Sequence, residues 1–171
     1  MHKLEFSVAA AFGLALGVGS LVDQPGTALS QPQGVEALQA IVGSWQSDTV
    51  SGTSALSTCA WAPVHGAVVC EQTITMPAGV RHGLSLFTFD PLDRKYVFYA
   101  LGKPGDPMHP VPLAISGRIW IYGGLTAGPD STRYRTVNDF SATGTYLWRQ
   151  ESSKDGEKWV AGIHGQSRRL P

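Results

Sequence analysis

The stretch STCAWAPVHGAVVCEQ (residues 57–72) contains both cysteines of the chain, with a proline, a histidine and a glycine midway between them. A turn centred on residues 64–65 would make the two flanking segments into neighbouring antiparallel strands, with Cys59 directly opposite Cys70. Facing residues on such strands have Cβ atoms about 4.5–5.5 Å apart, which is close to disulfide geometry. The stretch therefore predicts a β-hairpin with a disulfide across its two strands.

A zinc site is the alternative use of the two sulfurs. It would combine Cys59 and Cys70 with His65 and His82, but the sequence has no second pair of ligands at the usual spacing. A redox pair is no better supported, because the chain has no Cys-x-x-Cys. We therefore expect no metal at this stretch.

Short strand-like runs continue on both sides of this hairpin. They are rich in Thr, Val, Ile and aromatic residues and are separated by Gly, Pro, Asp and Ser. One helical turn is expected before them at residues 35–41, ended by Gly43. The spacing predicts an all-β protein, an antiparallel up-and-down barrel of 8–10 strands with a short N-terminal helix. The expected strands are 43–50, 54–62, 66–76, 81–90, 94–101, 111–116, 118–122, 132–140, 144–152 and 157–166.

A second hairpin is predicted at LFTFDPLDRKYVFYA (residues 86–100), where Asp90 and Pro91 are natural turn residues. A turn there places Phe87 opposite Phe98 on one face of the strand pair, and apolar residues also occupy the other face. Such a pair suits a barrel wall that encloses either a ligand or a packed aromatic core.

A third hairpin is predicted at TYLWRQESSKDGEKWVAGIHG (residues 145–165), with a three-residue turn at 154–156. That register sets Trp148 opposite Gly162 and Tyr146 opposite His164, so that a Tyr–His pair and a tryptophan share one surface. The alternative is an outward or rim histidine that hydrogen-bonds water.

The N-terminus resembles an export signal. Met1, His2 and Lys3 precede the apolar run VAAAFGLALGVG (residues 8–19), which is too short for a membrane span. We expect residues 1–30 to be a signal peptide and linker, residues 31–171 to form one barrel domain, and the protein to be periplasmic or secreted. A buried N-terminal helix of a cytosolic protein is the alternative.

The charge balance excludes several classes of partner. The chain has 13 basic and 13 acidic residues, a net charge of +0, and only 15% charged residues. Neither nucleic acid nor an anionic lipid surface would find a basic patch to bind. The expected partner is a small, largely apolar molecule, and the sequence leaves the oligomeric state open.

The segment VGSWQSD (residues 42–48) resembles the Gly-x-Trp signature that opens the first strand of lipocalins and other calycins. Together with AWAPVHGAVVCEQ, LFTFDPLDRKYVFY and ESSKDGEKW, it is similar in order to a group of uncharacterised bacterial lipocalin-like domains. The resemblance covers about residues 35–169. It implies a calycin-like barrel in which Gly43 and Trp45 open the first strand, Trp45 closes one end and an arginine, here Arg168, covers it.

A barrel of this size encloses room for one small ligand. The leading hypothesis is therefore a binding protein that uses no cofactor. Its expected lining is Trp61, Phe87, Phe98, Tyr122, Tyr146, Trp148 and His164.

Three alternatives remain. One is an isomerase, cyclase or hydrolase of the same fold, with His164 as acid or base beside Tyr146 or Asp139. Another is a haem protein with His164 as axial ligand. The last is a structural envelope or interaction module whose interior is filled by its own side chains.

Overall fold

One short 3-10 helix and ten strands make up the part of the chain that the computed structural model describes, residues 34–49, 52–63, 66–101, 109–123 and 130–171. Among these residues, no helix is long and apolar enough to cross a bilayer. The predicted leader and linker at 1–30 and the turn at 64–65 lie outside the described residues. The elements are η1 (Val35–Ile41), β1 (Gly43–Thr49), β2 (Ser54–Trp61), β3 (Ala67–Met76), β4 (Gly79–Asp90), β5 (Lys95–Leu101), β6 (Pro110–Ser116), β7 (Ile119–Gly123), β8 (Arg133–Ala142), β9 (Thr145–Ser153) and β10 (Val160–Arg169).

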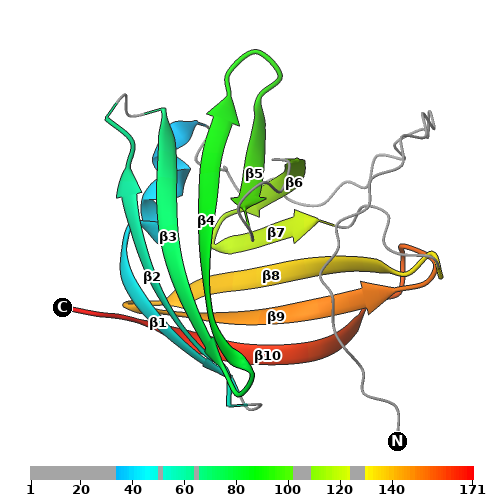
Figure 1. The fold of residues 1–171 in the computed structure, drawn as a ribbon. Coiled ribbons are helices and arrows are strands. Elements are labelled where there is room, and N and C mark those ends of the chain that lie inside the picture. The colour runs from blue at the N-terminus through cyan, green and yellow to red at the C-terminus, as the bar shows by residue number, and fades with distance from the viewer. Residues whose placement is uncertain (1–33, 50–51, 64–65, 102–108, 124–129) are drawn as a thin grey trace, which may run out of the picture.

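The strands form one closed antiparallel barrel (Figure 1). Each strand pairs with its neighbour in sequence, and β1 pairs with β10 to close the ring. This confirms the predicted up-and-down barrel and its short N-terminal helix. The strands also match the predicted ranges closely, with the largest differences at β10, which runs from Val160 to Arg169, and smaller ones at the start of β4 and the end of β8.

The first two hairpins have the predicted registers. Cys59 faces Cys70 across β2 and β3, and their sulfurs are joined in a disulfide. Because the sulfurs are bonded to each other, neither can serve as a thiolate ligand for zinc. In the second hairpin, Phe87 faces Phe98 across β4 and β5. Both side chains point into the barrel, where their ring centroids lie 5.0 Å apart.

The predicted register of the third hairpin is wrong. Tyr146 faces Ser167 and Trp148 faces Gly165, whereas His164 faces Arg149 on the outer surface. The loop is longer than three residues because Asp155 organises it: its Oδ1 accepts hydrogen bonds of 2.8 Å from the backbone N–H groups of the two residues 157 and 158. A β-bulge between residues 161 and 164 shifts the pairing further. Since neighbouring side chains of a strand point to opposite faces, the shift moves His164 out of the barrel.

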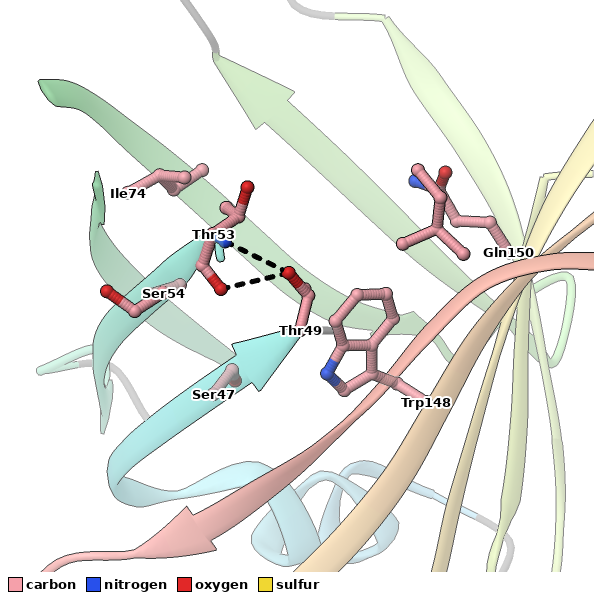
Figure 2. Close-up of a pocket in the computed structure, with 9 residues that line it drawn as sticks. Ser47, Thr49, Thr53, Ser54, Ile74, Trp148 and Gln150 are labelled. Atoms are coloured by element: carbon pink, nitrogen blue, oxygen red, sulfur yellow. Dashed lines mark hydrogen bonds between the residues drawn. The ribbon is translucent and has the colours of Figure 1, made fainter. Parts of the chain in front are cut away.

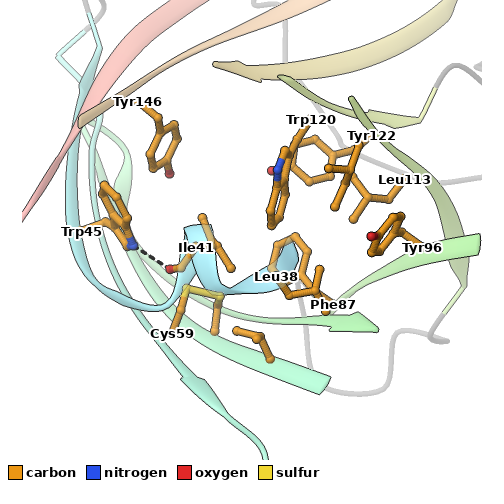
Figure 3. Packing of buried hydrophobic residues seen from close by; sticks show 13 residues of the cluster. Leu38, Ile41, Trp45, Cys59, Phe87, Tyr96, Leu113, Trp120, Tyr122 and Tyr146 are labelled. Atoms are coloured by element: carbon orange, nitrogen blue, oxygen red, sulfur yellow. Dashed lines mark hydrogen bonds between the residues drawn. A yellow bond between two sulfur atoms is a disulfide. The ribbon is translucent and has the colours of Figure 1, made fainter. Parts of the chain in front are cut away.

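The core lies at the end of the barrel that η1 covers. Leu38 and Ile41 point from η1 toward a cluster of aromatic side chains (Figure 3), and both are almost fully buried. The rings interlock in tilted and edge-on contacts with centroids 4.7–6.4 Å apart, as aromatic packing prefers. The cluster includes Trp45, Phe87, Tyr96, Trp120, Tyr122 and Tyr146, with Phe89, Phe98 and Phe140 packed against it.

Side-chain hydrogen bonds to β1, β2 and β5 hold η1 in this position. Trp45 donates from Nε1 to the carbonyl of Ile41 at 2.7 Å, and Trp61 donates from Nε1 to Oε1 of Gln39 at 2.8 Å. The hydroxyl of Tyr96 donates to the carbonyl of Gly34 at 2.9 Å. Because the bonds come from β1, β2 and β5, the helix is fixed to both sides of the barrel end and closes it.

The first strand opens on a glycine that the packing requires. Gly43 has φ 127°, a conformation that side chains disfavour, and a Cβ there would lie 2.8 Å from Nη1 of Arg169. The guanidinium carbon of Arg169 lies 4.5 Å from the ring centroid of Trp45. The predicted cover, Arg168, is wrong by one residue. Arg169 is the register partner of Trp45, while Arg168 points outward and pairs with Asp48 at 3.1 Å.

A small ionic cluster lies on the outer face of β8 and β9. Glu151 is buried there and accepts hydrogen bonds from Nε of Arg135 at 2.6 Å and from Nε of Arg149 at 2.5 Å. The guanidinium of Arg135 also stacks 4.0 Å from the ring centroid of Trp159. Burial by itself would raise the pKa of Glu151, but the hydrogen bonds from the two arginines outweigh it and hold the pKa below 4.5.

Glu151→Gln should lower the free energy of unfolding by about 1–2 kcal/mol at pH 7, because both arginines lose a charged partner. A carboxyl whose pKa is lowered on folding stabilises the protein above its ordinary pKa and loses that effect as the pH falls. The difference between wild type and variant should therefore be constant above pH 5 and shrink below the ordinary value of 4.5. Urea unfolding at a series of pH values measures it. The exposed Glu157→Gln is the matched control, and equal effects of the two changes would contradict the prediction.

Candidate functional site

A cavity of about 280 Å³ lies at the end of the barrel opposite η1 and is partly open to solvent. Its walls come from the last residues of β1, β3 and β9, the first residues of β2 and β10, and the turn between β1 and β2 (Figure 2). The cavity is therefore separated from η1 by the aromatic core. The residues that line it are Ser47, Thr49, Thr53, Ser54, Ala55, Ile74, Trp148, Gln150 and Ile163.

Hydroxyl groups form the boundary between this cavity and the core. Ser47 lines the cavity and shares a hydrogen bond of 2.5 Å with the fully buried Ser167 on β10. Both serines also hydrogen-bond Tyr146, the last aromatic residue of the core on this side. Burial raises the pKa of the Tyr146 phenol above 10.0, an effect that the two serine hydrogen bonds only partly offset. The boundary therefore consists of neutral hydroxyls at every physiological pH.

Trp148 supplies the largest side chain of the cavity wall. A Cβ at position 165 would lie 2.8 Å from Cζ2 and 2.9 Å from Cε2 of its indole, so the ring occupies space that only Gly165 leaves open. Its Nε1 is buried and has no hydrogen-bond partner among the described residues. Figure 2 shows that the edge of the indole carrying this nitrogen is turned toward Ser47 and Thr49 of β1.

The residue opposite Trp148 leaves the indole unpaired. Asn138 faces it across β8 and β9, but its Nδ2 donates to the hydroxyl of Tyr122 at 2.5 Å. Burial raises the pKa of Tyr122 well above 10.0, and the neighbouring Tyr146 adds to the effect. Tyr122 therefore remains a neutral phenol, and its hydroxyl accepts the hydrogen bond from the Asn138 amide on the core side of the barrel.

The described lining combines neutral polar groups with apolar surface. Its polar groups are hydroxyls, one amide and one indole N–H, and its apolar surface comes from Ala55, Ile74, Ile163 and the Trp148 ring. None of the nine lining residues is acidic, basic, histidine or cysteine, so none titrates near neutral pH. Such a cavity can hold a small uncharged molecule but offers no acid–base pair among its described residues.

The seven residues predicted to line a ligand site lie in three places, and one of them, His164, is exposed on the outer face. Trp61, Phe87, Phe98, Tyr122 and Tyr146 lie at the η1 end, where they pack against one another or against η1. Trp148 alone among the seven lines the cavity. The remaining lining residues were missed. One signal was available, since Ser47 and Thr49 alternate with Trp45 along β1 and so share its inward face.

The three candidate acid–base residues are not brought together. His164 is exposed on the outer face of β10, with its Nδ1 3.3 Å from the carbonyl of Gly162. Asp139 caps its own turn, where its Oδ1 accepts a hydrogen bond of 2.9 Å from the Ser141 N–H. Tyr146 is inside, so the barrel wall separates it from His164. The same placement turns His164 away from any haem inside the barrel.

Comparison with one solved structure supports the barrel fold. No protein-family model and no curated protein sequence matches the chain. The structure of the S-type phycobiliprotein lyase CPES from Guillardia theta matches 82% of this chain and 94% of its own, with a TM-score of 0.50 and 10% identity. The structure of EF1p2_mFAP2b bound to DFHBI matches 80% and 98%, with a TM-score of 0.36 and 13% identity. Likeness at such low identity concerns architecture alone: the chain has the fold of a calycin-like barrel.

Proposed function

We propose that the protein is exported and binds a small, largely apolar molecule in the cavity around Trp148. The observation that carries this proposal is the division of the barrel interior. One end is filled by interlocking aromatic side chains and covered by η1, whereas the other end holds about 280 Å³ of open space. A barrel that served only as a rigid structural module could fill both ends with its own side chains.

The fold supports this use. Antiparallel barrels of this size enclose space for one small ligand between inward-pointing side chains. The similarity to the S-type phycobiliprotein lyase supports the barrel fold. We also propose that the chain belongs to the lipocalin-like group that its sequence resembles.

Export is supported by two independent features. Residues 1–19 contain the short positive start and the apolar run of a secretory signal, and the barrel contains the Cys59–Cys70 disulfide. Disulfides persist in the periplasm and outside the cell, whereas cytosolic thiols are kept reduced. We propose a periplasmic or secreted location, with the leader removed near Gly19 or Ser30.

Filling the cavity should abolish binding. Ala55 points inward from β2 and lines the cavity, so Ala55→Phe places a ring where the ligand would lie. Native mass spectrometry of protein exported into a bacterial periplasm should show wild type with an added mass that denaturation removes, and Ala55→Phe without it. The denatured wild-type mass should also correspond to a chain that has lost 19–30 N-terminal residues.

Ala60→Phe is the matched control, because Ala60 lies on the same strand but is exposed on the outer face. It should keep the added mass. Retention of the same mass by Ala55→Phe would place any ligand elsewhere and overturn the proposed site. A full-length chain that remains in the cytoplasm would overturn the proposed export.

A further inference from the structure

The lining of the cavity restricts the chemistry of its occupant. We infer that the cavity takes an uncharged molecule with an apolar body and one hydrogen-bond acceptor, and that the acceptor pairs with the indole N–H of Trp148. The inference rests on the proposed function, because it specifies the ligand class of the same cavity.

The absence of charge in the described lining disfavours ionic ligands. A charged group that leaves water needs an opposite charge or several strong hydrogen bonds to replace its hydration. The nine lining residues supply no ionic partner. The nearest hydroxyl groups at the boundary, those of Ser47 and Ser167, are bonded to each other and to Tyr146. A carboxylate, phosphate or ammonium ligand would therefore bind poorly here.

The indole of Trp148 supplies the one buried donor that the cavity leaves unused. An indole nitrogen can only donate a hydrogen bond, so Nε1 needs an acceptor. Among the described residues it has none, although its atom is buried. Buried polar groups in native proteins are almost always paired, and an exception calls for a partner that binds there.

The two β1 hydroxyls that the indole N–H faces already have partners. The Thr49 hydroxyl donates to the carbonyl of Thr53 at 3.1 Å and accepts from the Thr53 N–H at 3.1 Å. The Ser47 hydroxyl is bonded to Ser167. A carbonyl, ether oxygen or ring nitrogen of the ligand can therefore supply the hydrogen-bond acceptor that Nε1 of Trp148 lacks.

The size of the cavity limits the apolar body. Its volume of about 280 Å³ equals the liquid volume of roughly nine water molecules, which suits a molecule of one or two fused rings. Ile74 and Ala55 face this space from β3 and β2, and the Trp148 ring offers a flat aromatic surface. The ligand class is thus a compact neutral ketone, ester, lactone or aromatic heterocycle.

Three probes of nearly equal shape test this inference. 2-Acetylnaphthalene carries a carbonyl acceptor, 2-isopropenylnaphthalene replaces the carbonyl by a methylene group, and 2-naphthoate is an anion. Their dissociation constants are measured by titration calorimetry with wild type, Trp148→Phe and the outer-face control Trp159→Phe. Circular dichroism and urea unfolding first show that each variant is folded.

Wild type should bind the ketone about tenfold more tightly than the alkene, and naphthoate most weakly. In Trp148→Phe the ketone and the alkene should bind within about twofold of each other, because the aromatic surface remains and the N–H is gone. Trp159→Phe should keep the tenfold preference. With ¹⁵N-labelled tryptophan, the Trp148 indole proton should shift downfield on addition of the ketone and not on addition of the alkene.

The contrary outcomes separate the inference from the function on which it rests. Equal binding of ketone and alkene by wild type, or a tenfold preference that survives Trp148→Phe, would overturn the inference and leave the binding cavity standing. Tightest binding of naphthoate would also overturn it. Failure of wild type to bind any of the three would count against the proposed cavity itself.

Discussion

Trp45→Ala should lower the free energy of unfolding by about 3–5 kcal/mol, the range for removing a large buried aromatic side chain. Trp45 is 2% exposed and its ring contacts Tyr146 at a centroid distance of 5.0 Å. The change also removes the 2.7 Å hydrogen bond to Ile41 and the stacking surface of Arg169. Because these contacts join η1, β1 and β10, the loss should loosen the closed end of the barrel.

Urea unfolding followed by far-ultraviolet circular dichroism measures this effect, since fluorescence itself changes when a tryptophan is removed. Trp159→Ala is the matched control: Trp159 packs on the outside against Arg135, and its loss should cost about 1 kcal/mol. Trp45→Phe should fall between the two, because it keeps a ring and loses the hydrogen bond. A Trp45→Ala effect no larger than that of Trp159→Ala would show that the closed end does not depend on Trp45.

Replacing both cysteines by alanine should lower the free energy of unfolding by about 3 kcal/mol. The disulfide joins residues 11 positions apart and mainly restricts the unfolded chain, which sets this magnitude for a short loop. The midpoint of thermal unfolding should fall by about 10 °C for a domain of this size. Both cysteines are buried in the same cluster as Leu38, so the folded variant should keep its barrel.

Scanning calorimetry of wild type and of Cys59→Ala/Cys70→Ala measures this difference. Reduced wild type should unfold at nearly the same temperature as the double variant, which separates the covalent link from any packing effect. Ligand binding should persist in the double variant, because neither cysteine lines the cavity. If the double variant were as stable as oxidised wild type, the disulfide would make no measurable contribution to the stability of the barrel.

The sequence predicted the wall of the barrel well because strand pairing follows local rules. Alternation and turn residues identified the strands, and the turn at Asp90 and Pro91 fixed the register of β4 and β5. The hairpin of β9 and β10 did not follow these rules. Its bulge between Ala161 and His164 and the loop around Asp155 depend on hydrogen bonds that composition does not reveal.

The candidate site was harder to predict than the wall. The alternation of side chains along a strand shows which residues point into the barrel. It does not show which part of the barrel interior is filled by side chains and which part is open. Phe87 and Trp148 therefore look equivalent in sequence, although Phe87 packs in the core and Trp148 borders open space. What separates them is the position of η1, which closes one end and gathers the aromatic rings there.

The pairing of β1 with β10 has a consequence for how the protein is made. Ser47 and Ser167 lie 120 residues apart in sequence, yet they meet across the seam that closes the ring. Contacts between such distant residues form slowly, and until they form both seam strands have unpaired edges that can aggregate. Ser47 and Ile163 stand on either side of the seam, so the cavity exists only after closure. A molecule bound there adds to the cost of reopening the ring and so protects the finished barrel.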